Sequence, residues 1–178
     1  RQLQSLVGKP IKRVNVGVPK PILTPLQRNE RLARRKIASL GYNECVSYSF
    51  IDKTGAIQFG SDDNLIPIDN PISVEMGYMR PDLLPNLLSA AYRNQARGYL
   101  DLKLFEVGTI FYGKEPNQQT LVASGLLIGC TNPRDTHGES RVVDTFDVKA
   151  DALITLDALG ATKRSTIYRD VPKIWHPG

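Results

Sequence analysis

The fold of this chain is decided by two runs in its second half, LKLFEVGTIFY at residues 102–112 and LVASGLLIG at residues 121–129. Each run is apolar and of strand length, and residues 113–119, which lie between them, are polar and typical of a turn. This pattern predicts an antiparallel hairpin. Because the second run is nearly continuous in apolar residues, we expect both of its faces to be covered.

Helical patterns surround the predicted hairpin. Thr24 followed by Pro25 predicts a helix over residues 26–40, and a second helix is expected over residues 83–97 with Asp82 as its N-cap. The glycines expected to end the three helices are Gly41, Gly98 and Gly160. The apolar residues expected to face the core are Leu26, Ala33, Ile37 and Leu40; Leu83, Leu84, Leu87, Leu88 and Ala91; and, in the third helix, Phe146, Ala150, Leu153 and Ile154.

Shorter patterns fill the rest of the chain. Short strands are predicted over residues 45–51, 65–68, 75–79 and 165–171, and a helical turn over residues 52–59. Consecutive strands joined by short turns indicate an antiparallel sheet flanked by helices, an α+β domain. We expect residues 1–24 to form a linker or extended arm and residues 25–178 to form the domain. The chain is expected to be an excised piece, truncated at its C-terminal end.

The composition is that of a globular domain. The chain has 178 residues, of which 41% are hydrophobic and 23% charged, which excludes collagen, coiled coils and disorder. The longest apolar run is too short to span a membrane, and no signal peptide opens the chain. Cys45 and Cys130 form neither a disulfide framework nor a zinc pattern. We therefore expect a cytoplasmic protein with no membrane partner.

No pattern in the chain is typical of an active site. Its two histidines, His137 and His176, stand beside no nucleophile motif, and no GxSxG, GxGxxG or Walker sequence is present. No two His or Cys residues lie at zinc-ligand spacing. We therefore assign no catalytic residue, no cofactor-binding residue and no metal ligand, although an ATP site built on strands would escape such a search.

Basic residues gather on two of the expected helices, and the net charge is +5. The expected outer face of the first helix carries Arg28, Arg31, Arg34, Arg35 and Lys36. Arg28, Arg31 and Arg35 share one face of this helix, and Arg93 and Arg97 project from the far end of the second. Either set could meet phosphates or an acidic partner, and a solvated face is the alternative. No aromatic residues that we expect to be exposed interleave with them, so stacking on single-stranded nucleic acid is not indicated.

Glu106 stands in the middle of the first apolar run. A buried carboxylate needs a partner, because an isolated charge is costly inside a protein. We expect a structural pairing with an arginine from another segment, Arg80 or Arg93.

Several stretches carry a resemblance to a known family. In chain order they are GYNECVSYSF (41–50), NPISVEM (70–76) with MRP (79–81) and LLP (83–85), Asn94 with Arg97, LFEVGTIF (104–111), DTFDVK (144–149) and WHPG (175–178). Together they resemble the beta subunit of bacterial-type phenylalanyl-tRNA synthetase. The matches keep their order from about residue 30 to residue 178.

The resemblance implies a fold like the catalytic core of class II aminoacyl-tRNA synthetases. It also implies a heterotetramer of two alpha and two beta chains, in which the alpha chain uses ATP and magnesium to attach phenylalanine to its tRNA. The beta module copies the fold and packs on the alpha subunit. The helix over residues 26–40 resembles one that class II proteins use at subunit interfaces, so Arg28, Arg31, Arg35, Arg93 and Arg97 are candidate contacts to the alpha subunit or to tRNA.

The same resemblance speaks against catalysis by this chain. Catalytic class II domains carry an Arg two residues before a Glu, where it binds the α-phosphate of ATP, and Leu104 stands at that place before Glu106. We therefore expect the fragment to be inactive alone and to hold no cofactor. Two alternatives stay open, an active class II adenylate-forming enzyme and a basic RNA-binding module. The family's editing, magnesium-binding and anticodon domains lie outside these residues.

Overall fold

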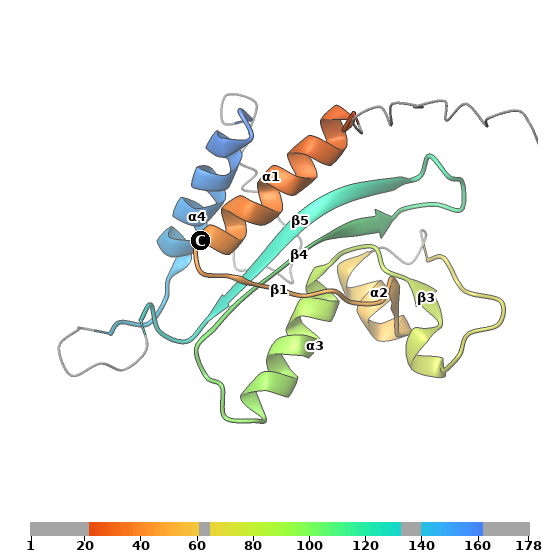
Figure 1. Cartoon of the computed structure of the whole chain (residues 1–178). Helices are drawn as coiled ribbons and strands as arrows, with labels where there is room; N and C mark the ends of the chain where they lie inside the picture. The colour runs from red at the N-terminus through yellow and green to blue at the C-terminus, as the bar shows by residue number, and fades with distance from the viewer. Residues whose placement is uncertain (1–21, 61–64, 133–139, 162–178) are drawn as a thin grey trace, which may run out of the picture.

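The computed structural model describes residues 22–60, 65–132 and 140–161 (Figure 1). Its elements are α1 (Pro25–Ser39), β1 (Asn43–Glu44), β2 (Phe50–Ile51), α2 (Lys53–Phe59), the 3-10 helix η2 (Val74–Met76), β3 (Tyr78–Met79), α3 (Leu84–Gln95), β4 (Leu102–Phe111), β5 (Gln119–Ile128) and α4 (Thr145–Ala158). Three expectations lie outside the described residues: most of the arm, the strand over residues 165–171 and the stretch 175–178.

The predicted hairpin is confirmed. β4 and β5 pair in antiparallel fashion along their whole length, from Leu102 opposite Ile128 to Phe111 opposite Gln119. β1 pairs with β4 in parallel, so the sheet order is β1–β4–β5, and β2 and β3 form a separate antiparallel pair. The α+β class is therefore as predicted. The parallel pair was not foreseen, because a two-residue strand is too short to show a periodicity.

Helices cover both faces of this sheet. α1 and α4 lie on one face and α3 lies on the other (Figure 1). Because side chains alternate along β4, the strand contributes to two separate core clusters. The first contains Ile37, Tyr42, Phe105 and Val107, and the second contains Leu87, Ala91, Leu102 and Leu104. β4, the strand that contains Glu106, is thus the central strand of the domain.

β5 is less covered than its sequence predicts. Every residue of this strand that the structure describes keeps part of its surface exposed. β5 is an edge strand of the described sheet, and α4 covers only part of it. Both faces of the run meet helices, as predicted, since Leu127 packs on the first core cluster and Ile128 on the second, but neither face is buried.

The start of α1 follows the predicted chemistry. The hydroxyl of Thr24 accepts a hydrogen bond from the Gln27 N–H (3.2 Å), and the Gln27 side chain accepts one from the Thr24 N–H (3.0 Å), which completes a capping box. Gly41, with φ +89°, follows the helix. Ala33 and Ile37 are buried as predicted, but Leu26 in the first turn is exposed, because the core cluster does not reach it.

Three of the predicted short strands form only in part. Residues 45–51 do not form one strand, since the chain leaves β4 after Cys45 and joins a different sheet at β2. Residues 75–79 split into η2 and the two-residue β3. Residues 65–68 make only a single bridge, at Pro67, whose nitrogen carries no proton to donate. The short helix after Asp52 is confirmed as α2.

α4 forms where a third helix was predicted but turns a different face to the sheet. The predicted stripe is exposed at Phe146 (76%), Leu153 and Ile154. The side facing α1 and β5 carries Ala152 and Leu156 instead. Since apolar and polar residues are mixed around this helix, its periodicity could not identify the side that faces the sheet.

Candidate functional site

A buried ion pair occupies the centre of the sheet. Arg80 Nη1 lies 2.7 Å from Glu106 Oε1, and both side chains are 4% exposed. Ser47 links the two groups, because its hydroxyl donates to Glu106 Oε2 (2.6 Å) and accepts from Arg80 Nη1 (3.0 Å). Arg80 Nε also donates to the carbonyl of Thr109 (2.9 Å). The structure thus brings Glu106 to Arg80 rather than to Arg93.

Three chain segments converge to build this network. Ser47 comes from the loop after β1, Arg80 follows β3, and Glu106 is central in β4. Gly108 makes room for the arginine, since a Cβ at that position would collide with Arg80 Nη2. The role of Ser47 was not foreseen, because a serine in a β-rich run carries no signal of its own. Arg80 and Ser47 therefore bind both carboxylate oxygens of Glu106.

The residue two places before Glu106 lies in an apolar environment. Leu104 is buried and packs in the cluster that contains Leu87 and Ala91 of α3. Its side chain can offer neither a charge nor a hydrogen bond. α3 therefore covers the strand position that the resemblance aligns with the ATP-binding arginine of catalytic class II domains.

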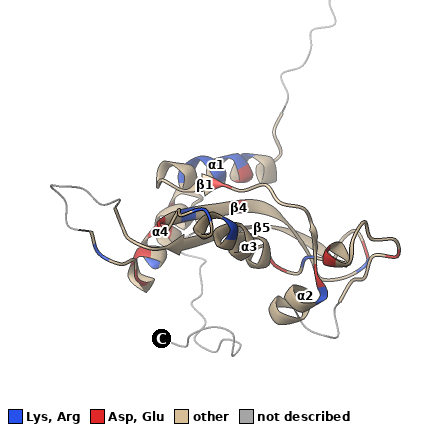
Figure 2. Ribbon diagram, turned by 90° about the horizontal axis from the view of Figure 1, so that it is seen from below, with Lys and Arg blue, Asp and Glu red and all other residues tan. Residues whose placement is uncertain are grey.

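The exposed face of α1 is basic (Figure 2). Arg28, Arg31 and Arg35 are all exposed, as the helical spacing predicts. Arg34 does not belong to this face, and that part of the prediction is wrong. Its guanidinium turns inward, donates to the carbonyl of Val107 (2.8 Å) and pairs with Glu30 and Glu44.

The two arginines at the end of α3 are also exposed. Arg93 Nη1 donates to the hydroxyl of Ser89 (2.8 Å), and Arg97 lies just beyond the helix. The structure adds two exposed tyrosines, Tyr92 and Tyr99, on the same part of the chain. The expectation that no exposed aromatic residues accompany these arginines is therefore wrong, because Tyr92 lies outside the buried stripe of the helix.

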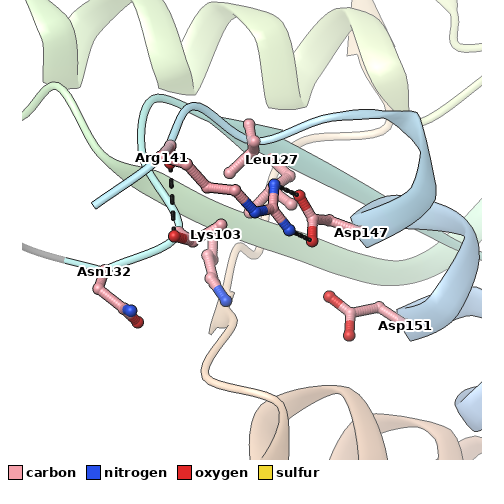
Figure 3. A pocket seen from close by; sticks show the side chains of 8 residues that line it. Lys103, Leu127, Asn132, Arg141, Asp147 and Asp151 are labelled. Atoms are coloured by element: carbon pink, nitrogen blue, oxygen red, sulfur yellow. Dashed lines mark hydrogen bonds and ion pairs between the residues drawn. The ribbon is translucent and has the colours of Figure 1, made fainter. Parts of the chain in front are cut away.

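A polar hollow of about 530 Å³ lies between the sheet and the start of α4 (Figure 3). Arg141 binds Asp147 through two hydrogen bonds of 2.7 and 2.6 Å, and this pairing lowers the pKa of Asp147 to about 2. Asp151, which also lines the hollow, accepts a hydrogen bond from the Tyr42 hydroxyl (2.9 Å). Burial, followed by this hydrogen bond, raises the pKa of Tyr42. These charges bind one another, which is typical of a structural cluster.

Metal ligands, free thiols and membrane-spanning helices are other features that could mark a site in the described residues. That part of the chain contains no group of three His, Cys, Asp or Glu residues arranged to hold a metal ion. Cys45 and Cys130 are free thiols, and burial raises the pKa of Cys45. Within the described ranges, no helix has the length and apolar character that crossing a membrane would require.

Comparison with known proteins gives a consistent result. The chain is 55% identical over 176 residues to the phenylalanine–tRNA ligase beta subunit of Ruegeria pomeroyi, an alignment that covers 99% of this chain and 22% of that protein. It is 46% identical over 162 residues to the same subunit of Rhodospirillum rubrum, with 90% and 20% covered. The chain thus spans about a fifth of the length of these curated relatives.

Solved structures agree on the fold. Pyrrolysyl-tRNA synthetase from Desulfitobacterium hafniense superposes with a TM-score of 0.55 at 18% sequence identity, covering 76% of this chain and 47% of that one. The fold is therefore that of a class II aminoacyl-tRNA synthetase core. A family model described as "Phenylalanyl tRNA synthetase beta chain CLM domain" matches residues 12–178. The chain belongs to this family of phenylalanyl-tRNA synthetase beta chain CLM domains.

Proposed function

We propose that this chain is the non-catalytic, synthetase-like module of a phenylalanine–tRNA ligase beta subunit. In the intact enzyme it packs on the alpha subunit, which attaches phenylalanine to its tRNA with ATP and magnesium. The relatives support the assignment to the beta subunit. That the module docks on the alpha subunit and does not catalyse the reaction is our inference, and it rests on the buried residues around Glu106.

The observation that carries this proposal is the buried apolar residue two places before Glu106, Leu104. Stabilising an α-phosphate needs a cation aimed at the charge, and Leu104 supplies none. Arg80, the arginine that pairs with Glu106, is already bound to that carboxylate and to the carbonyl of Thr109. A substrate would have to break a buried ion pair to reach these groups, which supports a structural role for the strand.

The beta subunit alone tests the absence of catalysis. We expect purified full-length beta to show no phenylalanine-dependent exchange of pyrophosphate into ATP, whereas the alpha–beta complex shows it. Exchange by beta alone would establish the alternative of an active adenylate-forming enzyme. The measurement needs no assumption about which surface meets the alpha subunit.

The basic face of α1 is our proposed contact to the alpha subunit. We expect Arg28→Ala/Arg31→Ala/Arg35→Ala in full-length beta to weaken binding of alpha by about tenfold or more, since arginines are frequent hot spots. A matched control, Lys53→Ala/Lys114→Ala/Lys149→Ala, removes the same charge from exposed positions elsewhere. Equal affinities for the two triple variants would refute this placement.

The same variants separate docking from RNA binding. A basic RNA-binding module would lose tRNA affinity steeply with added salt and through the α1 substitutions, with no change in alpha binding. We expect the opposite order, a loss of alpha binding with little change in tRNA binding. Fluorescence titration of both partners against the same protein preparation measures the two effects together.

A further inference from the structure

A second basic surface lies at the C-terminal end of α3, which packs on the face of the sheet opposite α1 (Figure 1). Arg93 stands in the last turn of the helix and Arg97 just beyond it, and blue marks this end of α3 in Figure 2. Their four-residue spacing places both on one side. Among the described residues neither arginine forms an ion pair, and Arg93 donates to the hydroxyl of Ser89 (2.8 Å).

Two exposed tyrosines accompany these arginines. Tyr92, directly before Arg93, is 75% exposed, and Tyr99, two residues after Arg97, is 62% exposed. A tyrosine ring is a large apolar body, so leaving two of them in water beside each other forgoes the gain from burying them. Aromatic rings that alternate with unpaired arginines are the combination on which single-stranded nucleic acids bind.

The turn after α3 holds the second tyrosine against the helix. Gly98, at φ +91°, reverses the chain, and its N–H donates to the carbonyl of Gln95 (2.9 Å). The Tyr99 N–H then donates to the carbonyl of Asn94 (3.1 Å), which completes a Schellman motif. The backbone of Tyr99 is thus fixed to the same turn of the helix that follows Tyr92. A surface that is already ordered loses less conformational entropy when it binds a ligand.

The charge of this surface is complementary to phosphate. Residues 83–100 contain no Asp or Glu, and the next acid along the chain, Asp101, accepts a hydrogen bond from a backbone N–H just after β5 (2.7 Å). Arg93 also borders a hollow that Asp52 and Glu75 line, but no ion pair joins it to either carboxylate in the described part of the chain. RNA phosphates would satisfy both guanidinium groups, and its bases would cover the two rings.

We propose that Tyr92, Arg93, Arg97 and Tyr99 form a binding surface for unpaired nucleotides of RNA. Phosphates bind the two guanidinium groups and bases stack on the two rings. The inference goes beyond the proposed docking on the alpha subunit and does not depend on it. Single-stranded loops and ends of a folded RNA supply such nucleotides, whereas bases inside a duplex are not free to stack on a side chain. Every base has a flat face, so little sequence preference is expected.

Fluorescence anisotropy with a labelled single-stranded oligouridylate and full-length beta measures the stacking. Both rings are exposed, so Tyr92→Ala/Tyr99→Ala should leave the fold intact, which circular dichroism checks, and should lower the affinity about tenfold or more. Tyr92→Phe/Tyr99→Phe keeps the rings and should keep the affinity. Tyr112→Ala, at another exposed tyrosine, is the control. An unchanged affinity in the double alanine variant would overturn the inference.

The salt dependence of the same binding measures the phosphate contacts. For single strands each phosphate contact contributes about 0.7 to the slope of log affinity against log salt, so Arg93→Ala/Arg97→Ala should make the slope shallower by about 1.4. The tyrosine variants should lower the affinity with no change in slope. Lys53→Ala/Lys114→Ala removes the same charge from exposed positions elsewhere and should leave the slope nearly unchanged. Equal slopes in the two charge variants would contradict phosphate binding here.

Photocrosslinking locates the RNA on the complex of alpha and beta. An oligonucleotide carrying 5-iodouridine couples under ultraviolet light to an aromatic side chain on which it stacks, and mass spectrometry of the digested protein identifies the peptide. We expect coupling at Tyr92 or Tyr99 and none at Tyr112. Coupling confined to other parts of beta or to alpha would overturn the inference. Failure of beta to bind alpha would refute the proposed function but not this surface, because the affinities are measured with beta alone.

Discussion

At the scale of single residues, the chain depends on one buried polar network. Arg80, Glu106 and Ser47 satisfy one another inside an apolar sheet. Such a pair contributes little net stability compared with well-packed apolar residues, but it is costly to break from one side. Its value to the domain lies in connecting three segments that are distant in the sequence.

Removing both partners of the pair should therefore cost less than the two single removals added together. We expect Glu106→Leu to lower the free energy of unfolding by about 3–5 kcal/mol, because it leaves the Arg80 guanidinium buried without its counterion. Arg80→Leu/Glu106→Leu should be less destabilised than the sum of the single variants. Urea denaturation of the four proteins gives the coupling. Additive costs would mean that the two groups act independently.

The pairing of Asp147 with Arg141 should appear as a pH dependence. The folded-state pKa of Asp147 is about 2, below its usual value of 3.8, and the pairing with Arg141 is the largest cause. Because the folded pKa is depressed, this contribution to stability is fully present above about pH 4 and is lost as the pH falls towards 2. An NMR titration of the Asp147 carboxyl measures the value. In Arg141→Gln it should return towards 3.8; no change would contradict the assignment.

At the scale of secondary structure, the elements with strong local chemistry were predictable. The Thr24–Pro25 start of α1 and the full length of the β4–β5 hairpin follow from capping residues and long apolar runs. The pairing of β1 with β4 was not predictable, because two residues carry no pattern and the contact depends on the rest of the sheet. The orientation of α4 failed for the opposite reason, since apolar residues lie on several of its sides.

Paired substitutions check the orientation of α4. Phe146 points away from the described residues and Leu156 faces the sheet. We expect Phe146→Ser to change the free energy of unfolding by no more than about 0.5 kcal/mol and Leu156→Ser to lower it by about 1–2 kcal/mol. Thermal unfolding of the two variants gives the comparison. A reversed order would mean that the predicted stripe, rather than the side that carries Leu156, faces the sheet.

At the scale of the whole molecule, the two core clusters share a single strand. Phe105 and Val107 serve one cluster, and Leu102 and Leu104 serve the other. The candidate contact arginines were found from the sequence because helical spacing alone places Arg28, Arg31 and Arg35 together. Tyr92 and Tyr99 were not found that way, because spacing alone did not show that the turn after α3 brings both tyrosines to one exposed surface.

A shared strand predicts one cooperative unfolding transition. We expect Ile37→Ala, in the first cluster, and Leu87→Ala, in the second, each to lower the midpoint of the same transition. Far-ultraviolet circular dichroism reports the helices, and near-ultraviolet circular dichroism reports the packing around the seven tyrosines. Coincident curves in all three proteins are the expected result. Separate transitions, each sensitive to only one substitution, would mean that the two layers unfold independently.

The parallel pairing of β1 with β4 also sets the order in which the domain assembles. β4 meets β5 through a short turn, but Asn43 meets Leu104 only after the chain closes a span of 61 residues (104 − 43). Closing a long span is slow, so the hairpin should form early and β1 should add late. Substitutions in the hairpin should then slow refolding. Substitutions in β1 should mainly speed unfolding, and the loop that carries Ser47 would reach its place among the last parts of the chain.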